Sequence, residues 1–275
     1  MLSPTEFVTM YQDLGRKKAN SPCLRVFLLA IFAGFLIAMG GMAANVAAHA
    51  QTNMSAARVI CGMLFPFALT MVIFTGAELF TGNCLIAISV LERTTTLVAM
   101  LKNLVVVYTG NFIGSLMSGA MVVYSGQLSL SDHLLAAYTI KIAASKCSIP
   151  FGQAVILGIL CNVLVCVAVM GGLSEKNAIG RFVGIIAPIS FFVIGGFEHC
   201  VANMYYIVAG LFAVTIPQYA QAATELGVDT SVLNWGNFFF MNLLPVTIGN
   251  VIGGCGLGCF LWLCHRQRSS ELVTR

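Results

Sequence analysis

The chain has 275 residues, of which 59% are hydrophobic and only 9% are charged, and its formal net charge is +4. Soluble domains carry about 25% charged residues, so this composition excludes an ordinary soluble protein and indicates an integral membrane protein. The apolar runs are about 20 residues or longer, as membrane-crossing helices require, and they lack the alternation of an outer-membrane barrel.

Residues 1–22 predict an amphipathic helix at the cytoplasmic surface of the membrane. A basic cluster follows four apolar side chains that recur at helical spacing, namely Phe7, Met10, Tyr11 and Leu14. The apolar run over residues 24–48 is longer than the core of a cleaved signal peptide, so it predicts the first membrane-spanning helix.

The second predicted span, residues 58–91, is interrupted in its middle by a polar stretch. Two glycines, two threonines, Glu78 and Asn83 stand there between apolar halves. At membrane depth such residues are tolerated only where they line a cavity or contact protein. We therefore expect a helix that stops and restarts.

Three further spans, like the first, are predicted without an interruption, over residues 97–124, 151–173 and 235–264. Asn162 is the one strongly polar residue inside the second of them. Residues 125–150 and 217–233 are expected to be soluble connections.

The remaining span, over residues 182–216, is interrupted by Glu198, His199 and Asn203 after a pair of glycines. Ionisable residues near the middle of a membrane-buried run mark a candidate functional site. A helix break there would expose helix ends to a cavity, as in transporters built from broken helices.

The basic residues predict the orientation of the chain, since cytoplasmic loops carry an excess of lysine and arginine. With six spans, one side holds Arg16, Lys17, Lys18, Arg25, Arg93, Lys102, Lys176, Arg181, Arg266, Arg268 and Arg275. The other side holds only Arg58, Lys141 and Lys146. Both termini are therefore expected in the cytoplasm.

The two interrupted spans share a pattern that predicts an internal repeat. Gly76, Glu78 and Asn83 correspond to Gly196, Glu198 and Asn203, and a Gly-Asn-x-Ile-Gly sequence follows each, at residues 110–114 and 249–253. We expect an all-α membrane protein with six transmembrane helices in two inverted three-helix repeats, about residues 23–125 and 150–265. The domain over residues 23–265 would lie between the N-terminal segment, residues 1–22, and a cytoplasmic tail, residues 266–275.

Residues 74–83 and 196–204 closely resemble the two signature segments of the formate/nitrite transporter family. The similarity extends to Asn162 and to residues 245–250. It implies an aquaporin-like protomer with one pore, a homopentamer in the cell (inner) membrane, and transport of small monovalent anions or their weak acids, with protons as partners. Formate, nitrite, hydrosulfide, acetate and lactate are the candidate solutes, with formate preferred.

The resemblance also implies roles for individual residues. His199 would be the central pore residue, with Thr81 and Asn162 as its polar neighbours and Lys146 in the outer vestibule. The outer constriction would comprise Phe65, Leu69 and Phe192, and the inner one Leu79 and Val165. Glu78 and Glu198 are expected to bind backbone groups freed at the helix breaks, and Asn83 and Asn203 to support the same structure.

Alternatives remain at this level. His199, Thr81 and Asn162 would also suit structural hydrogen bonds, and transport by a channel or a proton-coupled carrier is equally compatible with the residues. A nitrite or hydrosulfide channel, and more distantly a neutral-solute channel, are the other functions. An enzyme is not expected, since no nucleophile motif or metal-ligand spacing occurs; neither a metal, another cofactor nor a nucleic-acid partner is predicted.

Overall fold

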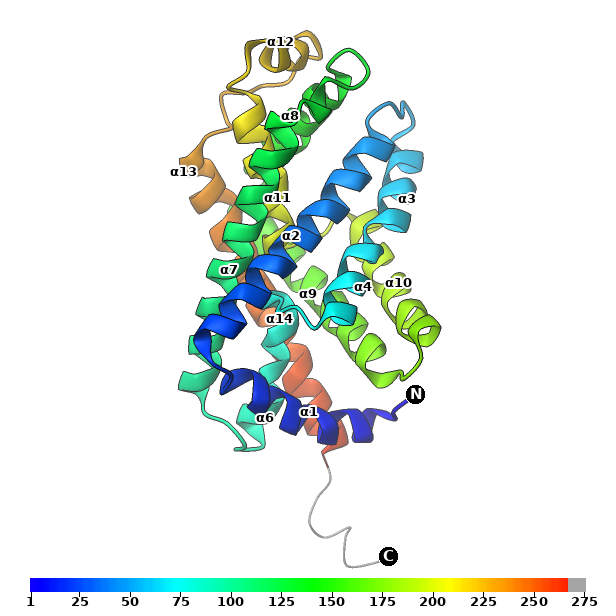
Figure 1. The fold of residues 1–275 in the computed structure, drawn as a ribbon, viewed down its shortest axis with the longest axis vertical. Coiled ribbons are helices and arrows are strands. Elements are labelled where there is room, and N and C mark those ends of the chain that lie inside the picture. The colour runs from blue at the N-terminus through cyan, green and yellow to red at the C-terminus, as the bar shows by residue number, and fades with distance from the viewer. Residues whose placement is uncertain (267–275) are drawn as a thin grey trace, which may run out of the picture.

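The structure is a computed structural model that describes residues 1–266, and these residues form an all-helical protein (Figure 1). Six helices in this part of the chain are long and apolar enough to cross a membrane. They are Cys23–Ala48, Met54–Thr75, Leu97–Tyr124, Phe151–Ser174, Ala178–Gly195 and Trp235–His265. The chain is thus a multi-pass membrane protein, and of the predicted tail only Arg266 lies within the described residues.

Helix α1 (Pro4–Ala19) begins at a capping box, in which Ser3 and Glu6 bind each other's backbone amides. Its apolar face is buried against the bundle rather than only against the membrane surface. Phe7 and Tyr11 are fully buried and pack with Leu85. In Figure 1, α1 crosses the lower end of the bundle, where α14 also ends.

The second predicted span, residues 58–91, does not form one continuous helix. Helices α3 (Met54–Leu64) and α4 (Pro66–Thr75) follow one another and stop at Gly76, whose φ is +68°. Helix resumes with α5 (Phe80–Asn83), the 3₁₀ turn η1 (Cys84–Ile86) and α6 (Ala87–Leu91). A left-handed residue after the last helical turn is a common helix end, and glycine adopts it without steric cost.

A second stop of the same kind separates α10 (Ala178–Gly195) from α11 (Cys200–Ala213). Gly196 has a φ of +69°, so it ends α10 as Gly76 ends α4. In both cases the chain runs extended for a few residues before the next helix begins, and these residues carry the polar side chains of the motifs.

Two long helix pairs hold these breaks. Helix α2 (Cys23–Ala48) packs along α7 (Leu97–Tyr124), and α9 (Phe151–Ser174) packs along α14 (Leu244–His265). Gly114 lies against the carbonyl of Ile31, and Gly249 against that of Val155, with no room for a Cβ. The small residues of the repeated Gly-Asn-x-Ile-Gly sequence therefore allow close helix contact, as in other membrane bundles.

The two connections expected to be soluble contain short helices that pack on the bundle. Residues 125–150 include the 3₁₀ turn η2 (Gln127–Ser129) and α8 (Leu134–Cys147), which packs on α11, where Ala143 lies against Gly210. Residues 217–233 include α12 (Pro217–Glu225), which packs on α8. Neither region is among the six candidate spans, so their place outside the membrane stays a prediction, and the structure adds that both contain packed helices.

The sixth span starts irregularly. A short turn, α13 (Trp235–Asn237), leads into a π-helical segment, η3 (Phe238–Leu243), before α14 begins. π-helical turns inside α-helices often occur at functional sites. Here the segment carries Asn242, which is fully buried.

Candidate functional site

Two asparagines bind the backbone groups that the helix breaks set free. The Asn111 side chain accepts a hydrogen bond from the Phe80 amide (2.9 Å) and donates to the Glu78 carbonyl (2.9 Å). Asn250 does the same at the second break, with the Cys200 amide (2.9 Å) and the Glu198 carbonyl (2.9 Å). Both asparagines are fully buried and belong to the repeated Gly-Asn-x-Ile-Gly sequence.

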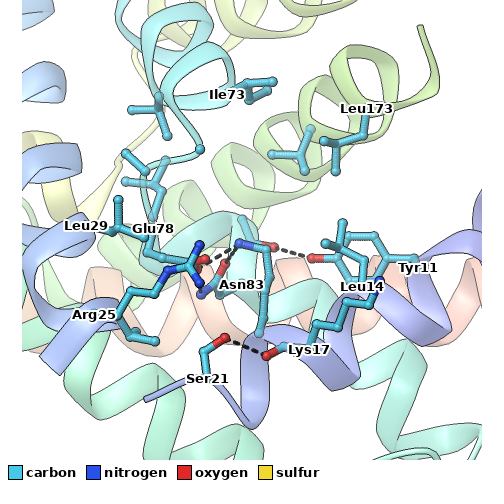
Figure 2. A pocket seen from close by; sticks show the side chains of 18 of the residues that line it. Tyr11, Leu14, Lys17, Ser21, Arg25, Leu29, Ile73, Glu78, Asn83 and Leu173 are labelled. Carbon is cyan, nitrogen blue, oxygen red and sulfur yellow. Dashed lines mark hydrogen bonds and ion pairs between the residues drawn. The ribbon is translucent and has the colours of Figure 1, made fainter. Parts of the chain in front are cut away.

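The glutamates have a different role from the one expected, because their carboxylates bind side chains and not the freed backbone. Glu78 accepts from Lys18 Nζ (2.8 Å) and from Asn83 Nδ2 (2.6 Å). Asn83 also donates to Asn103, which in turn donates to the Lys18 carbonyl. Figure 2 shows Glu78 and Asn83 side by side, with a dashed line for the hydrogen bond between them.

Glu198 sits in a matching network. It accepts from Lys146 Nζ (2.7 Å) and Asn203 Nδ2 (2.6 Å). Asn203 donates to Asn242 Oδ1 (2.8 Å), and Asn242 donates to the Lys146 carbonyl (2.9 Å). A buried carboxylate is tolerated when it is paired and its remaining lone pairs are satisfied, as they are here.

The sequence reasoning missed Lys18, Asn103 and Asn242. A signal for Lys18 was present: Lys18 stands four residues before Pro22, and Lys146 four residues before Pro150. Each of these prolines precedes a long membrane-spanning helix, α2 or α9.

The expected central residues meet between the two breaks. Thr81 Oγ1 lies 2.9 Å from His199 Nε2, and His199 Nδ1 accepts a hydrogen bond from the Ala202 amide (3.1 Å). Because Nδ1 uses its lone pair for that amide, the neutral ring carries its hydrogen on Nε2 and donates it to Thr81. The hydroxyl hydrogen of Thr81 has no acceptor among the residues 1–266 that the structure describes.

Asn162 forms no hydrogen bond with the imidazole in the described part of the chain. Its amide donates to the carbonyls of Thr81 (3.2 Å) and Asn250 (2.6 Å). It thereby links the first break to the asparagine that holds the second, which is a positioning role.

Two cavities approach the centre from opposite ends. The first, which we call the inner cavity after the side predicted to be cytoplasmic, has a volume of about 650 Å³, lies beside α1 (Figure 2) and is lined in part by Lys17, Lys18, Arg25 and Glu78. The outer cavity, of about 350 Å³, is lined in part by Arg58, Lys141, Lys146, Glu198 and His199. The two share no lining residue.

The apolar residues expected at the constrictions divide unevenly between the cavities. Phe65 and Phe192 line the outer cavity, in edge-to-face contact with ring centroids 5.7 Å apart, and Phe192 also stacks on His199. Leu69, expected beside them, lines the inner cavity together with Leu79. Val165 is buried and lines neither.

Comparisons with known proteins show which family the chain is similar to. Residues 5–263 match the family model described as formate/nitrite transporter. The chain is 34% identical to the formate channel FocA of Haemophilus influenzae, over 92% of this chain and 90% of that protein. It is 32% identical to a probable formate transporter of Methanothermobacter thermautotrophicus, over 96% of this chain and 97% of the other.

Solved structures are similar over most of the chain. A pentameric formate channel with formate bound aligns with a TM-score of 0.78 at 31% identity, over 90% of this chain and 98% of that one. An ion channel of the same family aligns with a TM-score of 0.77 at 25% identity, over 95% of this chain and 98% of that one.

Proposed function

The chain belongs to the formate/nitrite transporter family, and we propose that it carries small monovalent anions, formate first among them, through a pore in each protomer. The resemblance predicted from residues 74–83 and 196–204 is confirmed by the family match over residues 5–263. The curated relatives named above are channels and transporters, which supports transport as the activity and gives no support to an enzyme.

The observation that carries the proposal is the Thr81–His199 hydrogen bond between two cavities that open toward opposite ends. Moving a bare anion into a low-dielectric constriction costs on the order of 20 kcal/mol in the idealised limit, and several after relaxation. Donors at the narrowest part offset that cost. The free hydroxyl hydrogen of Thr81 is such a donor, and the Nε2 hydrogen of His199 polarises it.

The helix that begins after the second break also stabilises an anion at the centre. Helix α11 begins at Cys200, directly after His199, and its N-terminus carries about half a positive charge. A negative solute held near His199 is therefore favoured by the helix dipole. Phe65 and Phe192 would remove its water before it reaches the centre.

The tautomer limits how the solute could gain a proton. A neutral imidazole that already accepts at Nδ1 donates a hydrogen bond but has no acidic proton to release. To act as a proton donor, His199 would first have to bind a proton at Nδ1, and it would then lose the hydrogen bond that Nδ1 accepts from the Ala202 amide. We propose that the ring acts through hydrogen bonding in the conformation described, so that a proton reaching a permeating anion enters with the solute or from the cavity.

The finer architecture belongs to the same proposal. We infer two inverted repeats, each with one interrupted helix, because the lysine, glutamate and asparagine contacts of the first break recur at the second. We also propose a homopentamer in the cell membrane with both termini in the cytoplasm, a membrane domain over residues 23–265, and α1 as the N-terminal segment that covers the inner cavity. The pentameric relative and the lysine and arginine distribution support these points.

Flux into proteoliposomes tests the function. Purified protein should carry formate, and His199→Phe should lower that flux at least about tenfold, equivalent to 1.4 kcal/mol in the barrier. The oligomer should remain intact on a sizing column. The exposed-site variant Gln221→Ala serves as the control. Undiminished formate flux in His199→Phe would refute the central role.

The same assay separates the alternatives. Nitrite and hydrosulfide flux that exceeds formate flux would assign the pore to those anions within the same family. Flux of a neutral solute such as glycerol, without any anion flux, would overturn the proposal.

A further inference from the structure

All three basic residues expected on the outer side line one cavity. Arg58, Lys141 and Lys146 border the outer cavity together with a single acidic residue, Glu198. Lys146 is bound to Glu198 at 2.7 Å, so its charge is already balanced. Neither Arg58 nor Lys141 forms an ion pair with any residue in the described part of the chain.

We propose that Arg58 and Lys141, rather than Lys146, supply the charge that gathers anions in the outer vestibule, where they form an anion-holding subsite with Asn45. The inference rests on the proposed anion transport and assigns residues that act before the solute reaches His199. Its ligand class is a small singly charged oxyanion.

The two cations reach the cavity from different elements. One face of α8 lines the cavity through Tyr138, Lys141, Ser145 and Lys146, and Lys141 is the more exposed of the two lysines. Arg58 comes from α3, and its Nη1 lies 3.5 Å from the carbonyl of Ile194 at the end of α10. The positive charges thus border the cavity from two helices, and Lys141 is closer to bulk water than Lys146.

Asn45 supplies an independent sign of a ligand. Its side chain lines the same cavity and is only 4% exposed, and its amide nitrogen has no partner in residues 1–266. Buried donors are almost always hydrogen-bonded, because an unpaired one carries a desolvation cost. A carboxylate or nitrite oxygen in the cavity would be its acceptor.

The inner cavity repeats the charge pattern. It is lined by Lys17, Lys18 and Arg25 and by one acid, Glu78, which is bound to Lys18. Figure 2 shows Lys17 and Arg25 on either side of Asn83 in that view. Each cavity therefore has two basic residues more than are needed to balance its glutamate, and the excess lies outside the buried lysine–glutamate pair.

Charges of one sign in a cleft raise the local concentration and the entry rate of an oppositely charged solute, and salt screens the effect. The expected role therefore differs from that of His199. Loss of Arg58 and Lys141 should slow entry at low substrate concentration, while the passage step through the centre should be unchanged.

The first test is flux from the outer side of oriented vesicles. Arg58→Gln/Lys141→Gln should lower formate uptake about fivefold at sub-saturating formate and low ionic strength. At high salt the difference should vanish, and the maximal rate should stay at the wild-type level. Arg93→Gln/Lys176→Gln removes the same charge outside both cavities and should have no effect. Equal salt dependence in both double variants would overturn the assignment.

The Asn45 contribution has its own test. Asn45→Leu removes an unpaired buried amide, so it should fold at least as well as the wild type. It should raise the half-saturating formate concentration about tenfold without altering the salt dependence. An unchanged half-saturating concentration would remove Asn45 from the subsite.

A second readout does not depend on transport. Cys61 lines the outer cavity and is half-buried, so it reports the local potential. Its thiolate displaces methanesulfinate from a methanethiosulfonate reagent and forms a mixed disulfide, which peptide mass spectrometry quantifies. The rate ratio of an anionic to a cationic reagent cancels changes in the thiol itself, because both meet the same sulfur.

In Arg58→Gln/Lys141→Gln, that ratio should fall about tenfold at low salt. An unchanged ratio would refute the charge assignment even if formate flux is normal. A lowered ratio in a protein that carries no formate would uphold the charge assignment and refute the proposed function instead.

Discussion

At the scale of single residues, the centre depends on which nitrogen of His199 carries the hydrogen. The Ala202 amide occupies Nδ1, which directs the Nε2 hydrogen to Thr81 and leaves the Thr81 hydroxyl hydrogen free. The hydrogen bonds run from Ala202 through His199 to Thr81, so the last donor of this chain is the Thr81 hydroxyl. Hydrogen bonds in series polarise one another, which makes that hydroxyl a better donor to an anion.

This arrangement predicts different results for two substitutions of Thr81. Thr81→Ser keeps the hydroxyl and should retain formate flux within about threefold. Thr81→Val leaves the Nε2 hydrogen of His199 unpaired in a buried site, at a cost of about 1–3 kcal/mol, and removes the donor, so flux should fall at least about tenfold. Stopped-flow flux into liposomes measures both, and equal activity of the two variants would contradict the chain of donors.

At the scale of elements, the breaks are held by side chains from neighbouring helices. Asn111 from α7 and Asn250 from α14 each satisfy one amide and one carbonyl that a continuous helix would have satisfied internally. The left-handed glycines Gly76 and Gly196 end the first halves. A helix break in a membrane thus requires a partner helix at a fixed height, which explains the close glycine-mediated packing of α2 on α7 and of α9 on α14.

Removing one of these asparagines should therefore destabilise the whole protein. Asn250→Leu leaves the Cys200 amide and the Glu198 carbonyl buried without partners, at about 1–3 kcal/mol each. We expect the apparent melting temperature in detergent to fall by about 10 °C. Gln221→Ala, which removes an exposed helix-surface hydrogen bond to Glu225, should change it by less than about 2 °C. If Asn250→Leu were as stable as the wild type, the second break would not need the hydrogen bonds of Asn250.

The sequence predicted some of these elements and not others, for physical reasons. Long apolar runs identify the spans because few other structures tolerate them, and the repeated motif located Asn111 and Asn250, although their contacts were not foreseen. Lys18 was missed because a basic cluster before a span ordinarily reads as charge at the membrane surface. The side of Leu69 could not be derived, since an apolar residue near a constriction suits either cavity equally.

At the scale of the whole molecule, the lysine–glutamate–asparagine networks stand at two levels, with the Thr81–His199 pair between the breaks. Lys18 with Glu78 belongs to the inner cavity, and Lys146 with Glu198 to the outer one. Both cavities carry surplus positive charge, which suits anions that arrive from either side.

The proposed orientation is testable in intact cells. Gln51→Cys and Lys176→Cys place thiols in exposed turns at opposite ends of the bundle. A membrane-impermeant maleimide should label position 51 of Gln51→Cys from outside, and position 176 of Lys176→Cys only after the cells are opened, because the lysine and arginine excess predicts cytoplasmic termini. Peptide mass spectrometry locates the label, since native Cys61 also lines the outer cavity. The reverse pattern would invert the assignment of the inner and outer cavities.

The two breaks differ at the positions of the central residues, His199 and Thr81. Counted from the left-handed glycine of each break, His199 corresponds to Leu79 and Thr81 corresponds to Val201. His199 faces the outer cavity and Leu79 the inner one. A solute in the outer cavity can therefore contact the imidazole of His199, next to Phe65 and Phe192, whereas a solute in the inner cavity contacts the aliphatic side chain of Leu79. The two cavities are similar in charge, but only one of them ends at an imidazole. The pore should therefore rectify: at equal driving force, the rates of import and export should differ.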